Sequence, residues 1–212
     1  MKHEYDLYTA EQTRELDRLA IEQCVISGYE LMQRAGQSAF DQICQQWPDA
    51  RQLAIFCGAG NNAGDGYVVA RLAKQAGMTA NVYYLANPEG LKAEARQAWQ
   101  ACVDAGGVIE PFVSGMHRDT DVVVDALTGT GLDRELKDEW LTAVDCMNVS
   151  PWPVLAIDIP SGLHADSGQV MGAAVRADST IAFIGLNRGL FTGQASEYTG
   201  EIVFDDLQVD ES

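Results

Sequence analysis

Three short apolar runs of this sequence each lead into a segment with glycine and polar residues of kinds that bind ligands. The runs end at Cys57, Ala126 and Ile157, and they lead into the segments GAGNNAGDG, LTGTGL and DIPSGL. Aspartates stand at the end of two of these runs, as Asp125 and Asp158. A carboxylate can transfer protons or bind cations, and glycine lets a backbone turn close to a ligand. These residues therefore predict an acid–base or ligand-binding site.

The first segment favours a phosphorylated ligand. It leads straight into a predicted helix, whose first N–H groups and partial positive charge suit a phosphate. The spacing Gly58-x-Gly60-x-x-x-Gly64 is one residue longer than the dinucleotide fingerprint, and no acidic residue ends the second strand. Both departures disfavour an ordinary nicotinamide oxidoreductase. No Gly-Lys-Ser/Thr follows the segment, which disfavours a P-loop. A turn that serves only the fold stays open, although packing does not require the carboxamides of Asn61 and Asn62.

Asp125 and Asp158 have no lysine or arginine close by in the sequence. Two such carboxylates at strand ends suggest a bound cation or an altered protonation state. The simpler alternative for Asp125 is that it caps a turn. Pro160 stiffens the turn after Asp158, so we expect this carboxyl group and the Ser161 hydroxyl to be held in a fixed relation.

A rival interpretation makes Ser161 the nucleophile of a Ser/His/Asp triad. Pro-Ser-Gly differs from the Gly-x-Ser-x-Gly elbow that exposes such a serine. His164 is too near Ser161 in sequence to be an easy base, and His3 and His117 fall in segments that we expect at the surface. The triad is therefore disfavoured.

The elements that position these residues alternate between strands and helices, which is typical of β–α units and a parallel sheet. Two helices come first, and their starts are marked by Thr9 with Gln12 and by Ser27 with Glu30. The predicted helices cover about 9–25, 27–47, 64–76, 91–105 and 138–148, and the predicted strands 53–57, 80–85, 122–126, 154–157, 180–184 and 201–204. Ligands of open parallel sheets bind beyond the carboxyl ends of the strands, where the three segments lie.

Composition limits the class of protein. The 212 residues include 14 basic and 31 acidic side chains, which gives a formal net charge of −17, and 47% are hydrophobic. These values predict one well-packed domain and argue against disorder, membrane spans, nucleic acid and anionic membrane surfaces. Five separated cysteines and an amino terminus without an apolar segment predict a cytoplasmic protein. We expect a domain at 1–204 and an acidic tail or linker start at 205–212.

Taken together, GAGNNAGDGYVVARLAKQAG, VVVDALTGTGL and VLAIDIPSGLHADSGQVMGAAVRADSTIAF closely resemble the YjeF amino-terminal domain family, the NAD(P)H-hydrate epimerases. The resemblance extends from the paired amino-terminal helices to Gly200. It implies an α/β fold, a Rossmann-like three-layer αβα sandwich with a mostly parallel central sheet, and a homodimer. The implied reaction interconverts the R and S forms of NADHX and NADPHX, which are hydrated, damaged nicotinamide cofactors.

Members of the family often carry a second, ADP-dependent dehydratase domain. Because 212 residues cannot hold it as well, we expect this chain to epimerise without dehydrating. The resemblance gives no preference between NADHX and NADPHX.

The resemblance also implies roles for particular residues. Substrate contacts are implied for two segments, which comprise Asn61, Asn62, Ala63, Gly64 and Asp65, and Gly129, Thr130, Gly131, Leu132, Asp133, Arg134 and Glu135. Asp158 is implied to face the reacting ring. A potassium ion is implied at Asn62, Asp125 and Ser161, whose oxygen atoms suit a hard cation.

Our mechanistic hypothesis follows from the substrate, which carries a hydroxyl on the ring carbon beside the nicotinamide nitrogen. We expect the hydroxyl to leave as water and water to return to either face, with Asp158 as general acid and then base. The alternative function is a non-catalytic nucleotide-binding or scaffold module of the same fold. Such a module would not need Asn62, Asp125, Asp158 and Ser161 together.

Two positions depart from the family pattern. Ala63 replaces a glycine of the motif Asn-Asn-Gly-Gly-Asp-Gly, which would change the loop if that glycine has a positive φ. Asn187 stands where lysine is common, so any anion contact of that lysine is lost here unless Arg188 provides it.

Overall fold

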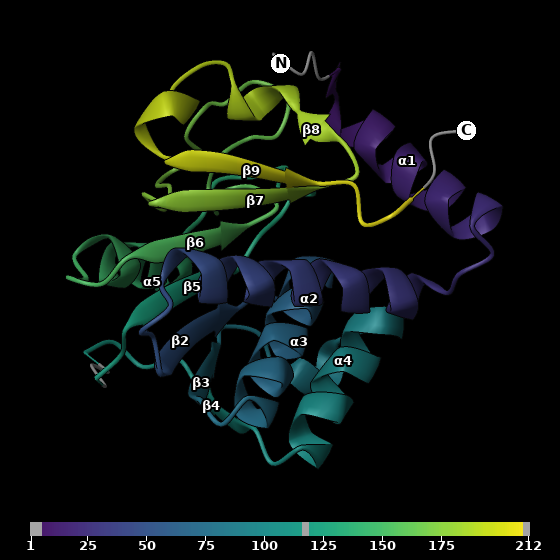
Figure 1. The fold of residues 1–212 in the computed structure, drawn as a ribbon. Helices are drawn as coiled ribbons and strands as arrows, with labels where there is room; N and C mark the ends of the chain where they lie inside the picture. Colours follow the sequence, from purple (N-terminus) through teal and green to yellow (C-terminus); the bar gives the residue numbers. More distant parts are fainter. Residues whose placement is uncertain (1–5, 116–118, 210–212) are drawn as a thin grey trace.

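Figure 1 shows the chain in a computed structural model, which describes residues 6–115 and 119–209. His3 and His117 lie outside the described residues. The described helices are α1 (Ala10–Gln23), α2 (Gly28–Gln46), α3 (Asn61–Gln75), α4 (Ala93–Asp104) and α5 (Glu139–Asn148). The strands are β1 (Leu7–Tyr8), β2 (Gln52–Cys57), β3 (Thr79–Tyr84), β4 (Val108–Pro111), β5 (Val122–Ala126), β6 (Val154–Ile157), β7 (Ser179–Phe183), β8 (Leu186–Asn187) and β9 (Glu201–Asp205).

One parallel sheet of seven strands forms the centre of the fold, in the order β4-β3-β2-β5-β6-β7-β9. From β2 the chain moves outward to β3 and β4, and it then returns to β5 and moves outward on the other side. This reversal opens a crevice beyond the carboxyl ends of β2 and β5. The short strands β1 and β8 pair separately, also in parallel.

Helices cover both faces of the sheet, with α2, α3 and α4 on one face and α5 on the other (Figure 1). Successive residues of β2 point to opposite faces. Leu53 and Ile55 belong to the core shared with α2 to α4, whereas Ala54 and Phe56 belong to the core shared with α5. The predicted α/β sandwich of three layers is therefore confirmed.

The capping residues at the first two helices act as predicted. The Thr9 hydroxyl accepts a hydrogen bond from the Gln12 N–H, and the Gln12 side chain accepts one from the Thr9 N–H. Ser27 accepts from the Glu30 N–H at the start of α2.

Helix α3 begins at Asn61, three residues before the predicted start at Gly64. The polar residues of the glycine segment form its first turn instead of a loop, with Gly60 as the N-cap. Ala63 is therefore helical, is fully buried and has no positive φ, so this departure from the family motif requires no change in the backbone.

Ordered structure continues past residue 204, where we expected the tail to begin. Asp205 is the last residue of β9, and Leu207 is 4% exposed in a small apolar cluster with α1 and α2. Arg34 of α2 donates a hydrogen bond to the Leu207 carbonyl oxygen. The sequence pattern also missed β4, a partly exposed edge strand that contains Glu110 and Pro111.

No helix in the described part of the chain is long and apolar enough to span a membrane.

A small residue is required where α2 crosses α3. A Cβ atom at Gly36 would overlap the side chain of Val68 and approach the Asp65 carbonyl oxygen. Gly36→Ala is therefore expected to lower the free energy of unfolding by roughly 1–3 kcal/mol, although alanine favours helix. Urea unfolding measures the effect. Gly90→Ala, which has open space around it, is the control, and equal stabilities of the two variants would contradict the packing argument.

Candidate functional site

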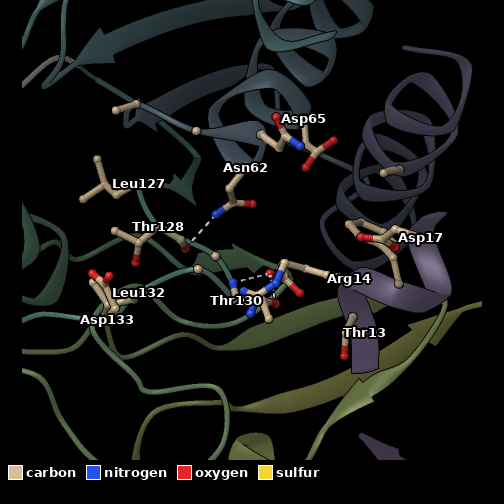
Figure 2. A pocket seen from close by; sticks show the side chains of 18 of the residues that line it. Thr13, Arg14, Asp17, Asn62, Asp65, Leu127, Thr128, Thr130, Leu132 and Asp133 are labelled. Atoms are coloured by element: carbon tan, nitrogen blue, oxygen red, sulfur yellow. Dashed lines mark hydrogen bonds between the residues drawn. The ribbon is translucent and has the colours of Figure 1, made fainter. Parts of the chain in front are cut away.

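A cavity of about 1400 Å³ lies at the carboxyl ends of the central strands, and Figure 2 shows part of its lining. Helices α1, α2 and α3 and the loop after β5 surround it. Most residues implied to contact substrate line it, namely Asn61, Asn62, Asp65, Gly129, Thr130, Gly131, Leu132, Asp133, Arg134, Glu135 and Asp158. Four residues implied in the site do not line it, namely Ala63, Gly64, Asp125 and Ser161. Ala63, Asp125 and Ser161 are fully buried.

The backbone at Asp158 is strained. Its φ is 69°, in the left-handed region that disfavours residues with a side chain, and the Ile159 N–H donates back to the Ile157 carbonyl oxygen at 2.9 Å. The Asp158 N–H still bonds to the Ile181 carbonyl oxygen of β7. This tight turn at the end of β6 aims the carboxyl group into the cavity.

Two hydrogen bonds anchor one oxygen of that carboxyl group. The N–H and the hydroxyl of Thr130 donate to Oδ2 of Asp158, at 2.8 and 2.7 Å. No described residue donates to Oδ1. Burial raises the pKa of Asp158, and the two bonds from Thr130 oppose that rise. The site thus holds a carboxyl group with one fixed and one free oxygen.

Gly129 makes this contact possible. A Cβ atom at this position would lie 2.6 Å from Oδ2 of Asp158. Only glycine therefore allows the loop after β5 to approach closely enough for Thr130 to bond.

Two further carboxyl groups face the same cavity, from α1 and α3 (Figure 2). Burial and the charge of Asp158 raise the pKa of Asp17 to about 7. Burial and the charges of Asp158 and Asp17 raise the pKa of Asp65 well above its usual range. Three mutually repelling carboxyl groups make the cavity a favourable place for positive charge.

Asp17 was missed in the sequence, as were its neighbours Thr13 and Arg14, which also line the cavity. A signal was present, because Asp17 lies four residues after buried Thr13 and three before buried Ala20, on the inward stripe of α1. A charged residue on such a stripe indicates either a polar cavity or an ion pair.

Beneath the floor of the cavity, Asp125 and Ser161 form a buried pair. Asp125 is 0% exposed; its Oδ2 accepts from the Ser161 N–H at 2.8 Å, and its Oδ1 accepts from the Ser161 hydroxyl at 2.6 Å. Burial raises the pKa of Asp125 to about 6 despite these bonds and one from the Leu127 N–H. Asp125 is therefore a hydrogen-bond partner of Ser161, whereas His164 is not.

Asn62 completes this group with an oxygen that lacks a partner. Its Nδ2 donates to the Thr128 carbonyl oxygen at 2.8 Å, and Ser161 Oγ lies 3.2 Å from the same oxygen. The Asn62 Oδ1 atom is buried and has no hydrogen bond within the described residues. Asn62 and Ser161 thus meet at the Thr128 carbonyl oxygen, and Asp125 is bonded to Ser161. Amide, hydroxyl and carboxylate oxygens are ligands of the kind that suits a hard cation.

The first turn of α3 offers a second binding feature. Its N-cap, Gly60, makes no side-chain hydrogen bond to the helix, so the first N–H groups have no cap from their own chain. They lie at the cavity beside Asn61. An uncapped helix start of this kind suits a phosphate group.

The structure also places Arg188, His164 and the acidic side chains. Arg188 does not line the cavity; its Nε donates to the Asp166 carbonyl oxygen, so it does not take the place of the family's lysine. The ring of His164 contacts Ser167 and the Asp166 N–H instead of Ser161. No group of three or more His, Cys, Asp or Glu in the described residues is arranged to hold a metal.

Comparisons with known proteins agree with this geometry. The profile of the family described as "YjeF-related protein N-terminus" matches residues 28–189. The bifunctional NAD(P)H-hydrate repair enzyme Nnr of Coxiella burnetii is 44% identical over 206 residues, which are 97% of this chain and 42% of that protein. The chain thus spans less than half of this relative.

Two other matches cover most of both chains. The NAD(P)H-hydrate epimerase of Legionella pneumophila (strain Corby) is 33% identical over 213 residues, which are 97% of this chain and 79% of that protein. The crystal structure of yeast ynu0 aligns with a TM-score of 0.75 at 19% identity, and covers 94% of this chain and 87% of that one. The yeast structure supports the fold alone.

Neutralising Asp17 is expected to change how stability depends on pH. The pKa of Asp17 rises from 3.8 to about 7 on folding, so the proton stabilises the folded state, and this contribution is lost as pH rises from about 4 to about 7. Asp17→Asn should therefore lose less stability over that range than the wild type, as measured by urea unfolding. Asp145→Asn, at an exposed position on α5, is the control. A wild-type slope in Asp17→Asn would contradict the burial of this carboxyl group.

Proposed function

The chain belongs to the family of YjeF-related protein N-termini, and from that premise we propose that it is an epimerase of hydrated nicotinamide cofactors. Its substrates would be the R and S forms of NADHX and NADPHX. One observation carries the proposal: the carboxyl group of Asp158 is anchored through Oδ2 and presents Oδ1 to a cavity large enough for a nucleotide.

The reaction needs one group that gives up a proton and then takes one back. The hydroxyl beside the ring nitrogen leaves as water when it receives a proton, and the nitrogen lone pair stabilises the cation that remains. Water then adds to either face and loses a proton. Asp158 serves as acid and then as base, and its raised pKa lets it hold a proton closer to neutral pH.

The charges of the cavity suit that intermediate. Asp17, Asp65 and Asp158 all face it, so a positively charged ring is favoured over a neutral one. The substrate's phosphates would lie at the uncapped start of α3 and against the loop that carries Arg134. Ala63 and Gly64 are buried in that helix, so any contact from Ala63 would come from its backbone N–H.

A potassium ion is proposed at Asn62, Asp125 and Ser161. The unpaired Oδ1 of Asn62 and the buried carboxyl group of Asp125 support it. When bound, such an ion would supply positive charge beneath the cavity floor. Two of these residues also hold the loop after β5 at Thr128. Asn62 Nδ2 donates to the Thr128 carbonyl oxygen, and the Thr128 N–H donates to Ser161 Oγ at 2.8 Å.

The wider setting is proposed from the relatives. Several of them are named bifunctional NAD(P)H-hydrate repair enzymes, and this chain spans 42% of the one from Coxiella burnetii. We therefore propose that the epimerase works with an ADP-dependent dehydratase, either in the same polypeptide or separately. The homodimer and the cytoplasmic location stay predictions.

Asp158→Asn is expected to bind substrate but to lose roughly 10²- to 10⁴-fold in turnover, because the amide cannot exchange the proton. Chiral-resolving chromatography of R-NADHX gives the rate, and equilibrium dialysis gives binding. Asp145→Asn, on the exposed side of α5, should keep the wild-type rate. A near-normal rate in Asp158→Asn would show that another group carries the proton.

Potassium is expected to raise the melting temperature by a few degrees relative to tetramethylammonium at equal ionic strength, because it binds only the folded protein. Asp125→Asn should abolish the difference between the two salts. The measurement is a thermal melt without substrate, so it does not depend on the activity. An equal response of wild type and Asp125→Asn would refute the cation site.

A further inference from the structure

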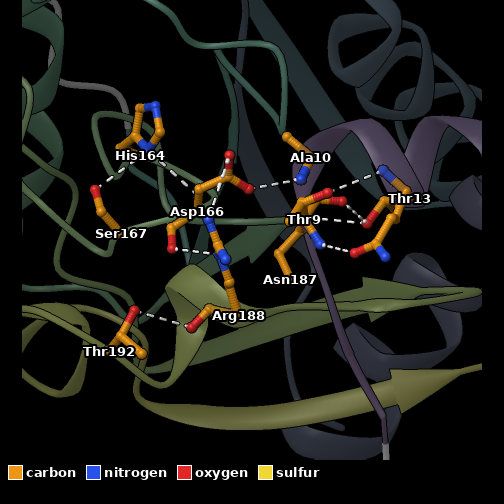
Figure 3. Close-up of polar contacts among 10 residues, drawn as sticks. Thr9, Ala10, Thr13, His164, Asp166, Ser167, Asn187, Arg188 and Thr192 are labelled. Carbon is orange, nitrogen blue, oxygen red and sulfur yellow. Dashed lines mark hydrogen bonds and ion pairs between the residues drawn. The ribbon is translucent and has the colours of Figure 1, made fainter.

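A series of hydrogen-bonded polar side chains links the first helix to the carboxyl group of Asp158. Thr13 Oγ1 and Asn187 Oδ1 are 3.0 Å apart, and Asn187 Nδ2 and Thr130 Oγ1 are also 3.0 Å apart. Thr130 Oγ1 is then 2.7 Å from Oδ2 of Asp158. Asn187 is 0% and Thr13 6% exposed. Figure 3 shows Thr13 and Asn187 together where α1 meets β8.

The direction of each bond in this series follows from donor and acceptor chemistry. An ionised carboxylate only accepts, so the single hydrogen of the Thr130 hydroxyl points to Asp158. The amide nitrogen of Asn187 only donates, so it occupies an acceptor side of the same hydroxyl. The Asn187 oxygen accepts from Thr13, whose hydroxyl also lies 3.1 Å from the Thr9 carbonyl oxygen.

The reversed amide does not satisfy the same groups. With Oδ1 of Asn187 toward Thr130, one hydroxyl hydrogen would face two acceptors, the amide oxygen and the Asp158 carboxylate. Either Asn187 or the ionised carboxylate would then lose the hydroxyl hydrogen, and hydrogen bonds to charged groups are the stronger ones. The Thr13 hydroxyl also faces two acceptors, but the Thr9 carbonyl oxygen already accepts from the Thr13 N–H at 2.8 Å, so this hydroxyl can donate to Asn187. The orientation with Nδ2 toward Thr130 is therefore the favoured one.

This orientation distinguishes the two oxygens of Asp158. A proton on Oδ2 would have to share the space with the N–H and the hydroxyl hydrogen of Thr130, which both point at this atom. Among the described residues the Thr130 hydroxyl donates only to Asp158, because Asn187 presents an N–H to it. Oδ1 accepts no hydrogen bond from the described residues and is the oxygen left for a proton.

We propose that Asn187 is a positioning residue for Asp158: through Thr130 it keeps Oδ2 a hydrogen-bond acceptor and so places the exchangeable proton on Oδ1. Its catalytic consequence rests on the proposed epimerase function, whereas the placement of the proton does not. Asn187 acts through Thr130 and does not itself line the cavity.

The surroundings of Asn187 hold it rigidly. Its backbone pairs with Tyr8, where β8 meets β1. The start of α1 is held by Asp166, because the Ala10 N–H donates to Asp166 Oδ1 at 2.7 Å. Arg188, the residue after Asn187, contacts the same aspartate (Figure 3). Both ends of the amide therefore meet fixed partners.

Other charged groups also influence Asp158, and they must be unchanged in the test. Asp17 of α1 and Asp65 of α3 repel its charge, as their own raised pKa values indicate. Arg14 of α1 lines the same cavity, as do the charged residues of the loop after β5, which are Asp133, Arg134, Glu135, Lys137, Asp138 and Glu139. The test variants leave all of these side chains in place.

The test is Asn187→Leu, which keeps a similar volume and removes the amide. The pKa of Asp158 is measured by NMR titration of ¹³C-labelled aspartate carboxyl groups, with its signal assigned by its loss in Asp158→Asn. We expect the pKa to rise by roughly half to one pH unit, because the ionised form loses support. The matched control is Asn148→Leu, which removes a hydrogen-bonded amide at the end of α5. It should leave the pKa of Asp158 unchanged.

An unchanged pKa in Asn187→Leu would overturn the proposal, even if the variant melts earlier, since Asn187 would then be merely structural. If this variant does not fold, Thr13→Val serves instead, because it removes the hydroxyl that orients the amide. A smaller rise in the Asp158 pKa supports the proposal, and no rise overturns it.

The epimerase assay separates this inference from the proposed function. Wild-type protein without activity refutes the function, and the NMR titration still decides the role of Asn187. If the wild-type protein is active and the acidic limb of the pH profile of kcat is the same in Asn187→Leu, the inference alone is refuted.

Discussion

The burial of two carboxyl groups at the carboxyl edge of the sheet is the constraint on which the rest of the site depends. Asp125 is the last residue but one of β5, and Asp158 follows β6. Asp125 is fully buried and Asp158 is partly buried. Each must therefore find hydrogen-bond donors within the chain. The loop after β5 supplies donors to both, with the Leu127 N–H to Asp125 and Thr130 to Asp158. This one loop thus couples the proposed cation site to the proposed catalytic group.

The cavity combines two preferences that the proposed substrate, a charged nucleotide, requires. The uncapped start of α3 favours the negative phosphates, whereas Asp17, Asp65 and Asp158 favour positive charge at the ring. At position 187 this chain has the neutral donor Asn187, bonded to Thr130. The acidic character of the ring site is therefore not offset by a cation at that position.

Much of the fold follows from local patterns, whereas much of the site does not. The apolar runs gave six strands of the sheet to within one residue at each end, because strands buried on both faces are continuously apolar. Asp125 and Asp158 were identifiable as site residues by their place at strand ends. The segment at the start of α3 also supplied candidate site residues, but its helical conformation was not predicted, since Asn61, Asn62 and Gly64 resemble a loop. Asp17 has the residue type expected on the solvent-exposed face of a helix. The bond from Asn187 to Thr130 joins residues 57 positions apart, which no local pattern reveals.

The proposed epimerisation is tested most directly by the fate of pure R-NADHX in ¹⁸O-labelled water, followed by chiral-resolving chromatography with mass spectrometry. We expect the protein to speed the approach to mixed epimers well beyond the spontaneous rate. We also expect ¹⁸O to enter the ring hydroxyl during this approach, because the hydroxyl leaves as water and water returns. A rate equal to that of the blank would refute the proposed function and indicate a binding module. Rapid epimerisation without ¹⁸O would contradict the acid–base role assigned to Asp158.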